Sequence, residues 1–268
     1  MSRFFRSLIR GPFFDLLLVL AFVALGPAGS LAQLPSSSAP ATSTTAPADA
    51  PRDVKLNIFA VLSPEIEAAV RAVSQDLMDQ EGLSTFPQLG FQIHCTLYMT
   101  NYPPAVLDEL VSRVKAFAAT TRAFPARTTR LQITKDNWFF LDLERDRNLQ
   151  SLSDAIVGLA SPLRSPTSFI PEWAKDNPEK VECIKQYGSP NVFSQFEPHL
   201  TLLANADGEA LARFLAKNGK NPAYALPIAG QVIAIGIGEA DRKGQIATPS
   251  AIFPLLPASA PTDLPTAP

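Results

Sequence analysis

The only two histidines of this chain begin the same four-residue pattern, His-x-Thr-Leu, at residues 94–97 and 199–202. An imidazole has an unperturbed pKa of about 6.5, so of two facing histidines one can accept a proton while the other donates one. The hydroxyls of Thr96 and Thr201 can donate hydrogen bonds to charged oxygens. Cleavage of a phosphodiester or cyclic phosphate needs this set of groups: a base, an acid and donors to an oxyanion.

Each tetrad lies in an apolar run, residues 91–99 and 198–204, which is typical of a strand. Alternate residues of a strand face the same side, so the histidine and the threonine of each tetrad point together. Both pairs can therefore line one cleft. The residues between and after them are expected to face a core: Cys95, Leu97, Leu200 and Leu202.

The elements around the tetrads follow one order twice, with the two histidines 105 residues apart. In each half a strand and a helix precede the tetrad strand, and a further helix follows it. We expect an α+β fold of two antiparallel-sheet lobes, with outer helices, around a central cleft. The elements are strand 56–62, a helix from Ser63 to Gly82, a helix from Pro103 to Phe117, strands 131–134 and 138–143, helices 149–159 and 209–217, and a hairpin of 231–237 and 245–253 with Gly244 in its turn.

Residues 1–32 are typical of an export signal that is cleaved near Ala32. Three arginines precede a short apolar run, and a small-residue site follows it. The alternative is an uncleaved membrane anchor, but the run is too short to span a bilayer comfortably. We expect a periplasmic or secreted protein whose mature form does not enter the membrane.

Residues 33–53 are rich in Ser, Thr, Ala and Pro, and residues 257–268 have the same character, so both are expected to be disordered. The two-lobed domain is expected between them, at residues 54–256. It contains an insertion at about residues 165–191. A connection of this length is usually functional or disordered, so a lid over the substrate and a surface loop both stay open.

The net charge of the mature chain excludes a broad, non-specific grip on nucleic acid. Removing Arg3, Arg6, Arg10 and Asp15 reduces 23 basic residues to 20 and 25 acidic residues to 24, which leaves −4. Non-specific binding to nucleic acid needs a basic surface. We therefore expect no stable nucleic-acid partner. The charge does not exclude a small phosphorylated ligand, which needs only local donors. The protein is expected to be a monomer.

Other chemistries fit the sequence less well. A metal site needs a carboxylate or thiolate at ligand spacing beside the histidines, and none is visible. A nucleophilic serine is disfavoured because the chain has no Gly-x-Ser-x-Gly elbow. Cys95 is expected to be a buried free thiol without a catalytic role. Whether Cys95 pairs with Cys183 stays open, because sequence does not give their separation.

The tetrads resemble the signature of the two-histidine (2H) phosphoesterase superfamily, which includes bacterial 2′-5′ RNA ligases and cyclic nucleotide phosphodiesterases. That signature is two His-x-Thr/Ser-x motifs, the second often preceded by an aromatic, a variable residue and proline, as in Phe196-Glu197-Pro198-His199 here. The resemblance covers roughly residues 55–253 and implies the same bilobal α+β fold. It also implies His94 and His199 as the acid-base pair, and Thr96 and Thr201 as phosphate ligands.

The sequence therefore predicts a hydrolase without a cofactor or metal, acting on 2′,3′-cyclic phosphates or related phosphodiesters from RNA or nucleotides. Ligation stays open, and so does which histidine is the base. The alternative is a non-catalytic protein that keeps the cleft to bind a phosphorylated nucleotide. An aromatic ring could stack on a base, and the candidates for this are Tyr98, Trp138 and Tyr187.

Overall fold

The structure is a computed structural model that describes residues 52–166, 168–221, 224 and 227–258. The predicted signal segment, nearly all of the predicted linker and most of the predicted tail lie outside these ranges. Within them, no helix is long and apolar enough to span a membrane. Neither the structure nor the comparisons described below support a signal peptide or a periplasmic location, so this prediction is corrected and not retained.

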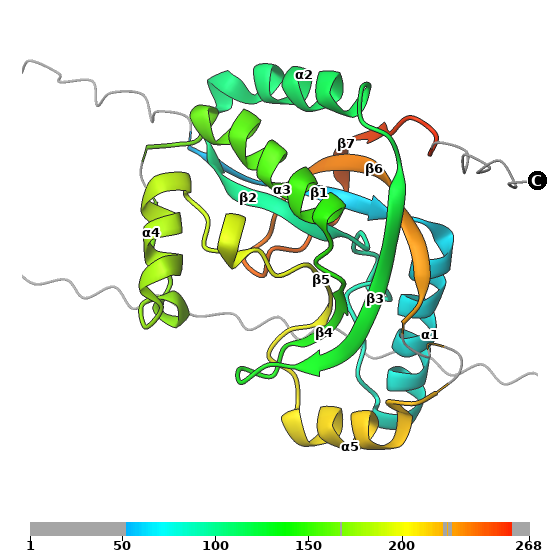
Figure 1. The fold of residues 1–268 in the computed structure, drawn as a ribbon. Coiled ribbons are helices and arrows are strands. Elements are labelled where there is room, and N and C mark those ends of the chain that lie inside the picture. Colours follow the sequence, from blue (N-terminus) through cyan, green and yellow to red (C-terminus); the bar gives the residue numbers. More distant parts are fainter. Residues whose placement is uncertain (1–51, 167, 222–223, 225–226, 259–268) are drawn as a thin grey trace, which may run out of the picture. The chain divides into compact units, whose positions relative to one another are not determined.

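The fold is α+β, as expected, with one seven-stranded antiparallel sheet (Figure 1). Its strands are β1 (Val54–Leu62), β2 (Cys95–Tyr102), β3 (Phe124–Ile133), β4 (Phe139–Leu143), β5 (His199–Leu203), β6 (Ala229–Glu239) and β7 (Pro249–Pro254). The helices are α1 (Pro64–Glu81), α2 (Leu107–Ala118), α3 (Arg147–Ala160), α4 (Pro178–Tyr187) and α5 (Gly208–Asn218). Every strand and helix predicted from the sequence is present, and most bounds differ by a few residues. The exception is β3, which begins at Phe124 and not at Leu131.

The strand pairings close into a ring. The order is β1-β2-β5-β4-β3-β6, and β6 pairs back onto β1, while β7 pairs with β6 outside the ring. The strands of the two predicted lobes belong to this one sheet. Strand β3 pairs with the first residues of β6, and β2 meets β5.

Helix α1 shows why the sequence folds as predicted. Ser63 adopts an extended conformation at the N-cap, Pro64 takes the first helical position, and Gly82 ends the helix in the left-handed region. One face of the helix is buried against the core. Its buried apolar residues recur at helical spacing: Ile66, Ala69, Val70, Val73 and Leu77.

The other helices cover the sheet from several sides. Helix α3 packs on β2, α2 packs on α3 and β7, and α1 packs on β6 and α5. In Figure 1, α4 lies on one side of the strands and α1 on the other. Helix α4 belongs to the predicted insertion, which is therefore partly helical rather than structureless.

Candidate active site

The two tetrads meet where β2 pairs with β5, through the register pair Cys95 and Leu200. In this antiparallel register His199 lies opposite Thr96, and His94 lies opposite Thr201. Cβ atoms of directly opposite residues are about 4.5–5.5 Å apart. The four intervening residues face the core as predicted, with exposures of 1% or less: Cys95, Leu97, Leu200 and Leu202. Both histidines and both threonines are therefore on one face of the sheet.

His94 immediately precedes β2 and is buried, with 6% of its surface exposed. Its Nδ1 lies 2.8 Å from the carbonyl oxygen of Gln92, and its Nε2 lies 3.2 Å from Nδ2 of Asn57. The ring also meets Phe59 edge to face, with 5.4 Å between the ring centroids. Asn57 and Phe59 of β1 thus enclose the ring, and Asn57 contacts Nε2, the nitrogen available for proton transfer.

His199 has a more open position at the start of β5. Its Nδ1 lies 2.7 Å from the carbonyl oxygen of Glu197, which leaves Nε2 for a substrate. The imidazole stacks on Phe140 of β4, with centroids 4.0 Å apart and an interplanar angle of 19°. Asp142 lies opposite His199 in the β4–β5 register.

A pocket of about 630 Å³ opens beside His199, on the side of β3 and β4. Most of its lining residues carry polar or charged side chains, as a ligand with several oxygens requires. Two of the lining residues form an ion pair: Arg130 donates to Asp142, with 2.8 Å between Nε and Oδ2. The lining residues are Thr129, Arg130, Gln132, Thr134, Phe140, Asp142, Leu143, Glu197, Pro198 and His199.

Burial lowers the pKa of both histidines, which favours their neutral forms. The pKa of His94 falls to about 4; the carbonyls of Gln92 and Gly244 oppose the shift, His199 adds to it, and Asp241 opposes it. The pKa of His199 is also lowered by burial. Three groups oppose that shift, namely the Glu197 carbonyl and the carboxylates of Asp142 and Glu197, while Lys180 adds to it.

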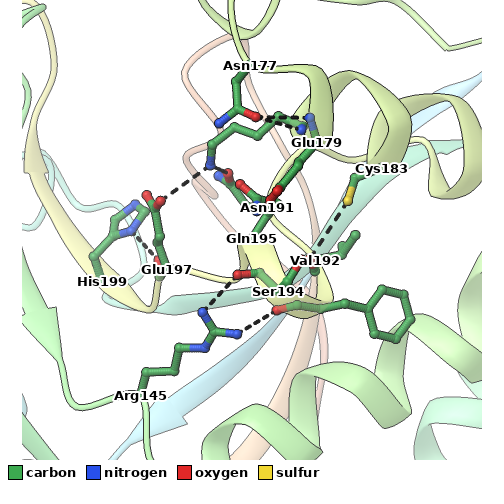
Figure 2. Close-up of polar contacts among 12 residues, drawn as sticks. Arg145, Asn177, Glu179, Cys183, Asn191, Val192, Ser194, Gln195, Glu197 and His199 are labelled. Carbon is green, nitrogen blue, oxygen red and sulfur yellow. Dashed lines mark hydrogen bonds and ion pairs between the residues drawn. The ribbon is translucent and has the colours of Figure 1, made fainter.

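Lys180 on α4 links the insertion to Glu197, two residues before the second tetrad. Figure 2 shows Asn191 and Glu197, the two residues that its ammonium group contacts. The Lys180 side chain is 12% exposed, and its Nζ lies 2.7 Å from Oδ1 of Asn191 and 3.5 Å from Oε1 of Glu197. The backbone carbonyl of Glu197 in turn holds His199. No described residue of 165–191 lines this pocket, and Lys180 reaches it only through Glu197, which does line it.

Arg145 holds the chain that leads into the second tetrad. Its guanidinium donates to the carbonyl of Ser194 at 3.0 Å (Figure 2) and to that of Phe193 at 2.9 Å. These residues precede β5 by a few positions, so Arg145 fixes the approach to His199.

None of the three aromatic candidates lines the pocket beside His199. Tyr98 is 1% exposed in the core, and its hydroxyl donates to the carbonyl of Tyr187, so it does not face the site. The reason is a register shift between Ile58 and Phe59: Phe59 pairs with Thr96 but Ile58 pairs with Tyr98, so the extra residue, Leu97, reverses the alternation. The prediction that Tyr98 shares the face of Thr96 is wrong.

Tyr187 and Trp138 pack against other aromatic side chains. Tyr187 ends α4 and packs on Phe193, with ring centroids 4.7 Å apart. Trp138 precedes β4 and meets Phe140 edge to face at 6.0 Å, so it lies one ring away from His199. Neither ring lines the pocket beside His199.

Both cysteines are free, so they form no disulfide. Cys95 is fully buried, and burial raises the pKa of its thiol to about 12. A neutral buried thiol is a poor nucleophile, which agrees with the structural role predicted for it. Among the described residues, no group of three or more His, Cys, Asp and Glu side chains is arranged to hold a metal ion.

One protein family matches this chain over more than half of its length. Its model, described as "Protein of unknown function (DUF1045)", matches residues 102–244. The chain belongs to the DUF1045 family. The DUF1045 match includes the second tetrad, the insertion and the β3–β4 hairpin, and it begins after the first tetrad. A comparison with curated protein sequences finds no match.

Several solved structures are similar to this DUF1045 chain at low identity. TT0787 of Thermus thermophilus is 19% identical with a TM-score of 0.49, and the alignment covers 75% of this chain and 97% of TT0787. LigT of E. coli is 14% identical with a TM-score of 0.42, covering 76% and 98%. Usb1 of Kluyveromyces marxianus is 10% identical with a TM-score of 0.42, covering 76% and 97%. The resemblance to two-histidine phosphoesterases continues to rest on the two tetrads and on the strands that carry them.

Sequence reasoning missed the groups around the tetrads: Asn57, Phe140, Asp142, Arg130 and Glu197. The signal available for two of them is the alternation of Phe140 and Asp142 on a strand that was itself predicted. What the sequence does not give is that this strand pairs with β5 and places Asp142 opposite His199.

Proposed function

We propose that this chain is a metal-independent phosphoesterase that hydrolyses 2′,3′-cyclic phosphates or related phosphodiesters derived from RNA or nucleotides. The observation that carries the proposal is the register pair between β2 and β5. It brings two histidines and two threonines from distant parts of the chain to one face of the sheet. A protein that only binds a phosphate needs no such pair of proton-transfer groups.

The reaction follows from the groups at this face. One neutral histidine takes a proton from a water molecule as the water oxygen bonds to phosphorus. The other histidine, protonated, gives its proton to the leaving oxygen as the phosphorus–oxygen bond breaks. Thr96 and Thr201 donate hydrogen bonds to the non-bridging oxygens, whose charge increases in the transition state. The polar pocket beside His199 accepts the rest of a small nucleotide or an RNA end.

The test is a screen of the full-length protein against the four 2′,3′-cyclic nucleotides and short 2′-5′ and 3′-5′ oligonucleotides, with and without EDTA. We expect hydrolysis of at least one cyclic phosphate, unchanged by EDTA and lost in His94→Ala and His199→Ala. The matched control is Cys183→Ser, which changes a residue outside the site. Binding without turnover in the wild type would contradict the enzyme and favour a nucleotide-binding protein. Joining of oligonucleotide ends would add ligation to the activity.

A further inference from the structure

Asn57 of β1 is a buried polar residue that the sequence did not single out. It is 0% exposed, and its Nδ2 faces three acceptors: Oγ1 of Thr96 at 2.8 Å, Nε2 of His94 at 3.2 Å and the carbonyl oxygen of Gly244 at 3.3 Å. Its Oδ1 is buried without a hydrogen-bond partner among the described residues. Leaving a buried amide oxygen unpaired is costly, so this arrangement needs a reason.

Two backbone carbonyls determine which way this amide points. A carbonyl oxygen can only accept, so Gly244 requires the NH₂ end of Asn57 and would repel Oδ1. The carbonyl of Gln92 requires a hydrogen on Nδ1 of His94. In a neutral ring with its hydrogen on Nδ1, Nε2 is an acceptor, and the Asn57 amide hydrogen matches it.

The same amide sets the direction of the Thr96 hydroxyl. Because Oγ1 of Thr96 accepts from Asn57, the hydroxyl hydrogen is free to donate to another group. Three acceptors share two amide hydrogens, so Asn57 can release His94 to a water molecule and still donate to Thr96 and Gly244.

We propose that Asn57 is a positioning residue that fixes the hydrogen-bond polarity of the first tetrad, so that His94 is the general base and Thr96 a donor to phosphate. His199 is then the general acid. This assignment rests on the proposed function, because it distributes the two proton transfers of that reaction. The proposal adds Asn57 to the site and assigns the direction of proton transfer, which the two tetrads alone do not give.

The surroundings of the two histidines agree with this division. His94 is enclosed, with a pKa of about 4, and the titratable groups that act on it are His199 of β5 and Asp241 of the β6–β7 connection. Asp241 favours the charged form, as do the carbonyls of Gln92 and Gly244, and burial outweighs all three. Burial and Lys180 lower the pKa of His199, but the ring also faces the carboxylates of Asp142 and Glu197, which favour its protonated form. A buried ring with an amide donor at Nε2 suits a base, and a ring beside carboxylates suits an acid.

Nuclear magnetic resonance of the imidazole nitrogens tests the assignment without any substrate, because the chain has two histidines. In the wild type at pH 6 we expect His94 to be neutral, with its hydrogen on Nδ1. In Asn57→Asp, a carboxylate next to Nε2 favours the imidazolium, so the pKa of His94 should rise by about one unit or more. His199 is the internal control in the same spectra and should shift less. A protonated His94, or a hydrogen on Nε2, in the wild type at pH 6 would overturn the proposal even if Asn57→Asp does not fold.

The pH dependence of kcat/KM then separates the role of base from the phosphoesterase activity itself. A general base must be deprotonated, so the acidic limb of the profile should move to higher pH in Asn57→Asp, together with the pKa of His94. Asn57→Leu, which adds no charge, should leave that limb within a few tenths of a pH unit and raise KM, because Thr96 loses its fixed donor. If the pKa of His94 rises while the acidic limb stays in place, His94 is not the base, although the enzyme remains a phosphoesterase. If no phosphodiester is cleaved at all, the proposed function fails, and the spectra still decide the role of Asn57 in holding His94.

Discussion

At the scale of residues, identical tetrads have different surroundings. His94 is buried behind Asn57 and Phe59, whereas His199 stacks on Phe140 at the edge of a pocket. A repeated motif therefore supplies two equal side chains, and the neighbouring strands make them unequal. Concerted acid-base catalysis needs such an inequality, since one group must be neutral when the other is charged.

The threonines are expected to contribute less than the histidines. A hydrogen bond to a charged oxygen contributes about 1.5–3 kcal/mol, so Thr96→Val or Thr201→Val should lower kcat/KM by about 10–100-fold. Thr→Ser at each position keeps the hydroxyl and should recover most of the loss. Steady-state kinetics on the best cyclic phosphate checks this. If the serine and valine variants are equally impaired, the hydroxyl is not the group that matters.

Strand alternation predicts one part of the site, and the pairing of distant strands decides the rest. The pairing of His94 with Thr96, and of His199 with Thr201, follows from strand alternation alone, and the core positions of Cys95 and Leu200 agree with it. Alternation fails two residues after Thr96, because the register shift at Leu97 points the side chain of Tyr98 into the core. Irregularities of this kind depend on the partner strand, and a single sequence does not show which strand that is.

At the scale of elements, the insertion is hydrogen-bonded to the sheet. The carbonyls of Tyr187 and Gly188 accept from the hydroxyls of Tyr98 and Thr100 on β2. Deleting residues 165–191 would leave the buried hydroxyl of Tyr98 unpaired and would lower stability. A loss of activity in the deletion variant would therefore not show whether the insertion is a lid. Single substitutions in α4 give a cleaner test of what the insertion does.

Lys180 and Glu197 are expected to move the pKa of His199 in opposite directions. The cation of Lys180 lowers this pKa and the carboxylate of Glu197 raises it, so Lys180→Met should raise it and Glu197→Gln should lower it. Glu197 is 70% exposed, so each shift should be a few tenths of a unit and should shrink in 1 M salt. Lys185→Met is the matched control, because Lys185 pairs with Glu182 on the same helix and both side chains are exposed. Histidine resonances followed against pH give the shifts, and movement in the same direction for both variants would refute the electrostatic link.

At the scale of the whole molecule, the order of strands and helices was predicted from periodicity, helix caps and turns. The end of α1 at Gly82 and the turn at Gly244, both with positive φ, are examples of such local signals. The closure of the sheet into a ring was not predicted, because it depends on β6 pairing with β1, β3 and β7 at once. Pairings between distant segments follow from the packing of the complete core, which local patterns do not describe.

The central claim is that His94 and His199 act together as acid and base, and a double-mutant cycle of turnover tests it most directly. Each proton transfer contributes about 10²–10⁴ in rate, so His94→Ala and His199→Ala should each lower kcat by that order. The double variant should lose much less than the product of the two effects, because one proton transfer is of little use without the other. Normal turnover in either single variant, or inactivation of the wild type by EDTA that added metal restores, would contradict the two-histidine mechanism.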